Sequence, residues 1–382
     1  MRYLIPEFTG IGDLIQKTPL IQSIAEIDQG ARIFLIGDNR WKGLDIVKDS
    51  RLIEETCNVV EMLRLELPQN YTNTGITKLY EKLRRQQRRT LSDWLRSIEW
   101  DVYFDNCHSD VPPIISRLVE KSGTGKIYRH ADINKREPSG FWEHLRSRGK
   151  SASIGLVPIL KGRHDIDANY DLLEAYLDRP FERNYDTWVA LRNDAYVVNR
   201  WGLHRNEYVC LQPGAANGAV TPKTWHPQNF VELSRKLIES YGMKVVLLGD
   251  QGDHEQIISK HKWPETVINT AAETSIEDLG SIISNAACVV AHDSGIMHLT
   301  NAMNVPLVAL YGPTDYTATR PRSKHHKILF SKTPAFAVMY RSNTSEKKLA
   351  EKYPNHEAMA GIDVDQVMCA VDELLTEHRS DG

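Results

Sequence analysis

The order of hydrophobic and polar positions near the start of the chain predicts a strand, a helix and a second strand. A short apolar run, Tyr3–Ile5, leads into a loop that holds Gly10 and Gly12. Leucine and isoleucine then recur at helical spacing between Leu14 and Ile27. A second apolar run occupies 32–37. Because such β-α-β units join parallel strands, we expect a parallel sheet.

The second half of the chain repeats this order more clearly. A helix predicted at 227–241 is followed by Gly242, and glycine is common directly after a helix. The alternation of strands, small-residue loops and helices predicts a second doubly wound α/β domain. Its strands are expected at 208–212, 244–249, 288–291 and 305–310.

The length of 382 residues is enough for two domains. We place an N-terminal domain at 1–195 and a C-terminal domain at 196–382, and leave open whether the helix predicted at 364–375 packs back on the first domain. Hydrophobic residues make up 41% and charged residues 25%, as in ordinary globular proteins. The formal net charge of -3 argues against a protein that binds nucleic acid through its overall charge.

The cysteines and the N-terminal residues indicate a reducing compartment. The cysteine number is odd and the C-x-x-C pattern is absent, so neither a disulfide framework nor a zinc knuckle is expected. The first residues reach an acidic Glu7 too soon for a signal peptide, and no apolar run approaches the roughly 20 residues that span a bilayer. We therefore expect a cytoplasmic protein with at most peripheral membrane contact. Its cysteines are expected to be buried free thiols: Cys57, Cys107, Cys210, Cys288 and Cys369.

Ligands of doubly wound sheets bind where the strands end, so the loops after the strands are the first candidates for chemistry. After the first strand, Gly12 lets a ligand approach the backbone closely. Asp13 follows at the predicted helix start, where backbone N–H groups favour an anion. Aspartate is also a common helix cap, and the spacing alone leaves that interpretation of Asp13 open.

Two later loops carry polar residues at the ends of strands. Gly214 and Ala215 begin a small-residue loop whose N–H groups can hold a phosphate, with Lys223 just beyond as a cation. The alternative is a tight loop with a solvated lysine. After the strand at 288–291, a stretch runs from His292 to His298.

This stretch combines groups for a phosphate and for a sugar. Ser294 and Gly295 can turn N–H groups toward a phosphate, and Asp293 can accept bonds from sugar hydroxyls. His298 lies one helical turn further on, and a buried, hydrogen-bonded histidine is the alternative interpretation there. The pattern G-x-S-x-G is missing, so a hydrolase triad is disfavoured. The chain also offers too few clustered ligands for a metal.

A basic segment between Lys78 and Arg96 alternates cationic and apolar side chains at helical spacing. A solvated helix face is the common explanation. The second explanation is a surface for an anionic acceptor or an anionic membrane. No recognisable nucleic-acid-binding module surrounds the segment, so we expect no nucleic-acid partner. The candidate surface residues are Lys82, Arg85, Arg88 and Arg89.

Taken together, the loops resemble those of the bacterial heptosyltransferases, glycosyltransferase family nine. The order and spacing agree over the first forty residues and again from about 208 to 315, whereas 60–200 is not matched. One departure is His226, which stands where the family usually has proline. The pieces that carry the resemblance are Gly12–Leu14, Thr18–Leu20, Gln212–Ala215, Lys223–Phe230, Val246–Gly249, Asp293–Leu299 and Pro306–Thr314.

The resemblance implies the GT-B arrangement, in which two Rossmann-like domains flank an interdomain cleft with the active site. It makes Asp13 the general base and Lys223 the holder of the donor diphosphate. Donor contacts would also come from Gly12, Gly214, Ala215, Asp250, Asp293, Ser294, Gly295, Ile296 and His298. Asp250 belongs to an acidic loop that faces the nucleoside, and Gly295 and Ile296 offer N–H groups. No metal or other cofactor is expected.

The function implied is that of an inverting glycosyltransferase that uses a nucleotide-diphosphate heptose, ADP-heptose. Its acceptor would be an anionic glycolipid such as lipopolysaccharide core, and contact with the inner membrane would be peripheral. A protein acceptor, such as an autotransporter serine, is a variant of this hypothesis. Two other classes stay open: a nucleotide-sugar epimerase of similar architecture, and a non-catalytic protein that binds nucleotide sugars.

Overall fold

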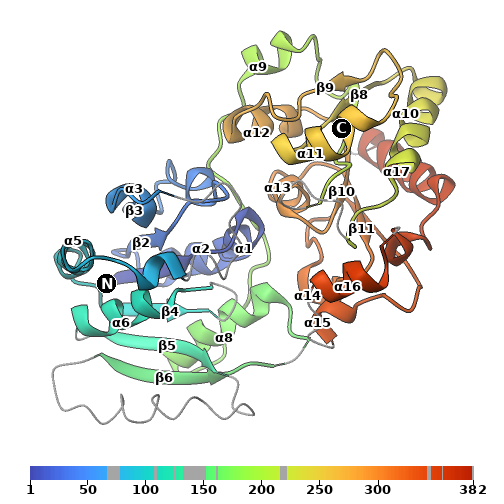
Figure 1. Cartoon of the computed structure of the whole chain (residues 1–382). Coiled ribbons are helices and arrows are strands. Elements are labelled where there is room, and N and C mark those ends of the chain that lie inside the picture. The colour runs from blue at the N-terminus through green and yellow to red at the C-terminus, as the bar shows by residue number, and fades with distance from the viewer. Residues whose placement is uncertain are drawn as a thin grey trace. The chain divides into compact units, whose positions relative to one another are not determined.

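The chain forms two compact units, Met1–Tyr185 and Asp186–Gly382, each with its own sheet (Figure 1). Residues 186–195, which we placed in the first domain, belong to the second unit. These residues are bonded to the second unit: Asp194 N donates to Ser281 Oγ at 3.0 Å, and Asn301 donates to Thr187 Oγ1 at 2.8 Å. The computed structural model describes residues 1–66, 78–106, 110–123, 125–131, 152–160, 162–215, 222–341, 346–354 and 356–380.

The first domain is built on a six-stranded parallel sheet in the order β3-β2-β1-β4-β5-β6. The predicted parallel β-α-β start is thereby confirmed. The strand order reverses direction between β1 and β4, so the ligand crevice expected for such a sheet lies at their carboxyl ends. The strands are β1 Arg2–Glu7, β2 Arg32–Gly37, β3 Glu55–Asn58, β4 Val102–Asp105, β5 Lys126–Ala131 and β6 Ser153–Pro158.

The helix expected between Leu14 and Ile27 is divided in two. Helix α1 ends at Ile15, and α2 begins at Thr18 with Pro19 in its first turn. Proline is favoured there because it lacks an N–H that would have no intrahelical partner. The helices of this domain are α1 Ile11–Ile15, α2 Thr18–Ile27, η1 Leu44–Ile46, α3 Val59–Met62, α5 Arg85–Ser97, α6 Pro113–Ser122 and α8 Asp165–Leu177.

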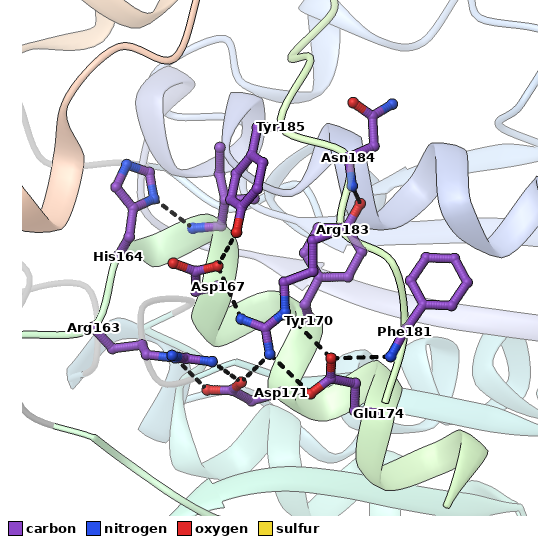
Figure 2. A network of polar contacts seen from close by, with 11 residues as sticks. Arg163, His164, Asp167, Tyr170, Asp171, Glu174, Phe181, Arg183, Asn184 and Tyr185 are labelled. Atoms are coloured by element: carbon purple, nitrogen blue, oxygen red, sulfur yellow. Dashed lines mark hydrogen bonds and ion pairs between the residues drawn. The ribbon is translucent and has the colours of Figure 1, made fainter. Parts of the chain in front are cut away.

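A network of ion pairs fastens the last residues of the first domain to α8 (Figure 2). The Arg183 guanidinium lies 2.9 Å from Asp167, 3.0 Å from Asp171 and 2.8 Å from Glu174. Tyr185 OH donates to Asp167 Oδ1 at 2.7 Å. The chain is thus held against one helix up to the boundary between the two units.

The second domain also contains a six-stranded parallel sheet, in the order β12-β11-β10-β7-β8-β9. This confirms the predicted second doubly wound domain. The order reverses between β7 and β10, so the loops after these strands flank its crevice. The strands are β7 Tyr208–Leu211, β8 Lys244–Leu247, β9 Ile268–Asn269, β10 Cys288–His292, β11 Leu307–Tyr311 and β12 His326–Phe330.

Helix α17 contacts α10 and the strands β10, β11 and β12, so it covers the sheet of the second domain (Figure 1). Gly242 ends α10 with a left-handed φ of 63°, as its position in the sequence predicted. The helices are α9 Ala195–Arg200, α10 Pro227–Tyr241, α11 Gln251–Gln256, η2 Ile258–Lys260, α12 Ile276–Ser284, α13 Gly295–Ala302, α14 Tyr316–Thr319, α15 Val338–Arg341, α16 Glu346–Lys352, η3 Glu357–Met359 and α17 Val364–Ser380.

The cysteine prediction is confirmed in part. Cys57, Cys210 and Cys288 are buried free thiols. Cys369 is exposed, because it occupies the outer face of α17 while the helix buries its apolar face. Cys107 lies outside the described residues. Among those residues, no helix combines the length and the apolar composition needed to cross a bilayer.

Candidate functional site

Asp13 lies on the short helix that follows β1. The N-cap of α1 is Gly10, and Asp13 is the third residue of the helix, with a half-buried side chain. The interpretation of Asp13 as the N-cap is therefore wrong. Gly12 precedes it in the first turn. The sheet order places this turn beside the crevice of the first domain, next to the end of β4.

A hollow beside α1 separates the loop after β1 from the loop after β2. It is small and partly open to solvent. Burial raises the pKa of the Asp38 carboxyl at its wall to about 6, although the adjacent Arg40 guanidinium acts in the opposite direction. The lining residues include Thr9, Gly10, Asn39, Trp41 and Gly43.

In the second domain, His292 holds the loop after β7 in place. Its Nδ1 lies 2.7 Å from the Gly214 carbonyl oxygen, which only accepts, so Nδ1 carries the proton. Its Nε2 then accepts from Trp225 N at 2.8 Å. Burial lowers the pKa of His292 to about 4, which keeps the ring neutral as this pair of bonds requires. The sequence drew attention to His292 without giving it a role.

Lys223 and Asp293 come together from the loops after β7 and β10. Lys223 Nζ lies 3.8 Å from Asp293 Oδ2, and the Asp293 side chain is only 5% exposed. The other oxygen, Oδ1, accepts from Thr319 Oγ1 at 3.1 Å. Oδ2 makes no hydrogen bond to any described residue. A buried carboxylate oxygen of this kind is suited to accept a bond from a ligand hydroxyl.

The first turn of α13 points backbone N–H groups into the same crevice. Ser294 is the N-cap of this eight-residue helix, and its side chain makes no cap bond. Its hydroxyl donates instead to Gln212 Oε1 at 2.8 Å. The N–H groups at Gly295 and Ile296 therefore lack the usual side-chain acceptor at the N-cap, and such a helix start favours an anion.

His298 is buried one turn further along α13, with 7% exposure. Burial lowers its pKa to about 4, so the ring is neutral at physiological pH. Asp293 and Lys223 both influence that pKa, which places the three side chains in one cluster. The structure thus brings together the sequence candidates of the two loops.

The two aspartates of the acidic loop after β8, Asp250 and Asp253, make different contacts. Asp250 is the N-cap of α11 and accepts from Asp253 N at 2.9 Å. Asp253 is the residue that packs against the loop after β7: a Cβ at Gly214 would lie 1.7 Å from its Oδ1. Burial, helped by the charge of Asp250, raises the pKa of Asp253 to about 7. Gly249 also packs against Asp253, and it is the feature of the sequence that could have indicated this close approach.

Comparison with known proteins identifies the family. The profile of glycosyltransferase family 9 (heptosyltransferase) matches residues 140–349, more than half of the 382 residues. The chain belongs to glycosyltransferase family 9.

Family 9 relatives match either a part of the chain or nearly all of it. Lipopolysaccharide heptosyltransferase 2 of Escherichia coli K12 is 33% identical over 150 residues, 37% of this chain and 41% of that protein. The chain thus aligns with less than half the length of this relative. Lipopolysaccharide heptosyltransferase 3 of the same strain is 26% identical over 381 residues, 96% of each chain.

A solved heptosyltransferase structure shares the fold. The E. coli heptosyltransferase WaaC with ADP-2-deoxy-2-fluoro heptose has a TM-score of 0.64 and 16% sequence identity. The superposition covers 98% of this chain and 99% of that one. A fold of two Rossmann-like domains agrees with the two sheets described above.

The departure at His226 changes how α10 begins. His226 is the N-cap, and its Nδ1 accepts from Gln228 N at 3.1 Å. The helix then starts with Pro227, which has no N–H to satisfy. In this family 9 member a histidine side chain therefore caps the N-terminus of α10.

The basic segment forms α5 and the turn before it. Lys82 and Arg85 are exposed. Arg88 donates to the carbonyl oxygens of Leu83, at 2.9 Å, and Glu81, at 3.0 Å, so it also stabilises the preceding turn. Arg89 is 83% exposed. Helix α5 and the turn before it therefore present cationic side chains to solvent, although Arg88 also donates hydrogen bonds to the backbone.

Proposed function

We propose that this family 9 protein is an inverting glycosyltransferase that moves a heptose from ADP-heptose to a hydroxyl of an anionic glycolipid such as lipopolysaccharide core. The observation that carries the proposal is the cluster of Lys223, Asp293 and His298 beside the first turn of α13. The names of the curated relatives support the acceptor class. The ADP-heptose analogue in the WaaC structure supports the donor.

The second domain would bind the donor. Lys223 and the N–H groups of Gly295 and Ile296 supply positive charge for the diphosphate. Oδ2 of Asp293, which makes no hydrogen bond to a described residue, would accept a bond from a sugar or ribose hydroxyl, with neutral His298 beside it. The loop at 214–215 would offer backbone N–H groups to the phosphates.

The nucleoside end would lie toward the acidic loop after β8. Asp250 is engaged as a helix cap, whereas Asp253 keeps a buried Oδ1 with no hydrogen bond to a described residue. We therefore give the contact with the nucleoside to Asp253 in preference to Asp250.

The transfer step would use groups from both domains. The Asp13 carboxylate takes the proton of the acceptor hydroxyl as its oxygen attacks the anomeric carbon. The bond from that carbon to the diphosphate oxygen breaks on the opposite face, which inverts the anomeric centre. The leaving electron pair stays on the diphosphate, where Lys223 and the helix N-terminus stabilise it. The proposal assigns no step to a metal or another cofactor.

The acceptor would approach the first domain. Its α5 region presents Lys82, Arg85 and Arg89 to solvent, and such cations attract the phosphates and carboxylates of a glycolipid. We place the reaction at the cytoplasmic face of the inner membrane, with α5 in peripheral contact with anionic lipid.

A donor panel with mass spectrometry tests this function, with intact and truncated core glycolipid as acceptors. Addition of one heptose to the glycolipid is the expected result. Transfer only to a serine of an autotransporter would replace the acceptor in the proposal. A change of the donor sugar without any acceptor would support an epimerase. Donor binding without turnover on either acceptor would support a non-catalytic binding protein.

Asp13→Asn tests the assignment of the base. The amide has nearly the same shape but cannot take a proton, so kcat should fall by about 10²–10⁴-fold. Donor affinity, measured by calorimetry with ADP-heptose, should stay within about twofold, because the substitution keeps the shape of the side chain and the groups proposed to hold the diphosphate, Lys223 and the first turn of α13, lie in the other domain. Transfer at the parent rate would remove Asp13 from the mechanism.

A further inference from the structure

Helix α1, which carries Asp13, is too short to be stable by itself. It has five residues, Ile11–Ile15, and no side chain caps its N-terminus at Gly10. A single helical turn gains few hydrogen bonds for the backbone order it requires. The position of Asp13 therefore depends on the groups that hold the two ends of the helix.

The start of α1 is held by a buried carboxylate at the end of β1. Glu7 Oε1 accepts from Thr9 N at 2.8 Å and from Thr9 Oγ1 at 2.5 Å. The Arg40 guanidinium donates to the Phe8 carbonyl oxygen, and Arg40 in turn pairs with Asp38 at 2.7 Å. Phe8 and Thr9, two of the three residues between β1 and α1, are thus held by side chains of β1 and of the loop after β2.

The end of α1 is held by a buried ammonium group that returns to the same carboxylate. Lys17 Nζ lies 2.6 Å from Glu7 Oε2 and donates to the Pro6 carbonyl oxygen at 2.9 Å. Asn169 also donates to the carbonyl oxygen of Gln16 at 2.9 Å. The Glu7–Lys17 ion pair therefore links the segment before α1 to the segment after it, and Asp13 lies on the helix between them.

The ion pair between Glu7 and Lys17 is buried, and a buried ion pair adds little to the stability of a fold. The side chains of Lys17 and Glu7 are 2% and 3% exposed. Removing two charges from water costs so much that an apolar pair of similar size is often at least as stable. What an apolar pair cannot supply is the directed bonds to Thr9 and Pro6, which fix where the helix begins and ends.

We propose that Glu7 and Lys17 are positioning residues that set the orientation of Asp13 for proton removal from the acceptor. The inference rests on the proposed role of Asp13 as the base. Lys17 lies four residues after Asp13, one helical turn away, so a shift of either end of α1 moves the carboxylate. Displacement of a reacting group by about 1 Å can cost about a hundredfold in rate.

The first test compares Thr9→Val with Thr9→Ser. Valine has nearly the same shape as threonine but loses the hydroxyl that donates to Glu7, whereas serine keeps it. We expect Thr9→Val to lower kcat by about three- to tenfold and leave the donor KM unchanged, and Thr9→Ser to match the parent. A merely structural bond would change the unfolding temperature and leave kcat in place.

The second test removes both charges at once in Lys17→Met/Glu7→Gln. The double variant leaves no unpaired buried charge, so we expect it to fold, with an unfolding temperature close to that of the parent. Its kcat should fall by about a hundredfold with the donor dissociation constant unchanged. If the double variant does not fold, the Thr9 pair decides alone.

The experiments distinguish a failure of the positioning role from a failure of Asp13 as the base. Parent-like kcat in both Thr9→Val and a folded double variant would overturn the positioning role, provided that Asp13→Asn is inactive. Full activity of Asp13→Asn would overturn the proposed base instead. Expected support is a loss of kcat in Thr9→Val and in the double variant, with donor affinity retained in both.

Discussion

Replacing Gly214 by alanine would place a methyl group inside the space of the Asp253 carboxylate. The new Cβ would lie 1.7 Å from Oδ1, 2.2 Å from Cγ and 2.8 Å from Oδ2, far inside ordinary contact. Asp253 has little room to move, because Gly249 also packs closely against it: a Cβ at Gly249 would lie 2.7 Å from the Asp253 Cβ. Overpacking of such a buried position costs about 1–3 kcal/mol. We expect Gly214→Ala to lower the free energy of unfolding of the second domain by about 2 kcal/mol.

A double-mutant cycle isolates the contact. Asp253→Ala removes all three clashing atoms, so alanine at Gly214 should cost much less in that background. We expect a coupling free energy of about 1–3 kcal/mol in favour of the double variant, measured by urea unfolding. Gly242→Ala is the matched control, because its left-handed φ strains the backbone while no atom lies within 4 Å of the added Cβ. It should show no coupling to Asp253→Ala beyond about 0.5 kcal/mol.

Additive costs for Gly214→Ala and Asp253→Ala would refute the packing argument. They would mean that the loop after β7 moves away from α11 without penalty. The proposed contact of Asp253 with the nucleoside would not be affected, because it rests on the buried Oδ1 that makes no hydrogen bond to a described residue.

Two further predictions follow from the same domain. Asp253→Asn should become more stable relative to the parent as the pH rises from about 4 to about 7, by up to about 4 kcal/mol in urea unfolding. The pKa of Asp253 is raised from 3.8 to about 7, so the folded parent binds more protons than the unfolded chain and loses stability as the pH rises; a constant difference would contradict this. His226→Ala should lower the free energy of unfolding by about 0.5–2 kcal/mol and His226→Asn should restore most of it, whereas equal values for the two variants would show that the cap bond to Gln228 is unimportant.

The fold was accessible from the sequence because its strands are buried on both faces. The runs that became β1 and β10 are almost continuously apolar, and the glycines and small residues after them mark the loops. The rule that ligands bind at strand ends then led to Asp13, Lys223 and Asp293 without a structure. The break between α1 and α2 was missed although Pro19 marks the start of α2 in the sequence. What this reasoning could not supply is the reach of the Lys17 ammonium group back to the end of β1.

The details of the candidate site depend on contacts between residues far apart in the chain. The link from His292 to Gly214 joins residues separated by 78 positions, and no local pattern announces it. The choice of Asp253 over Asp250 likewise follows from which of the two keeps a buried oxygen without a hydrogen bond to a described residue. Local patterns predicted the kinds of groups at the strand ends, and tertiary packing decided which atoms are buried and left without partners.

The ion pairs of Arg183 have a consequence for how such a protein can be divided or recombined. All of the carboxylates that bind this arginine lie on α8, so the anchor of the segment before the boundary belongs entirely to the N-terminal half. A cut after Tyr185 would leave every one of these bonds on the same fragment. The junction at 185–186 is therefore a site where the first unit of one relative can be joined to the second unit of another without breaking these ion pairs.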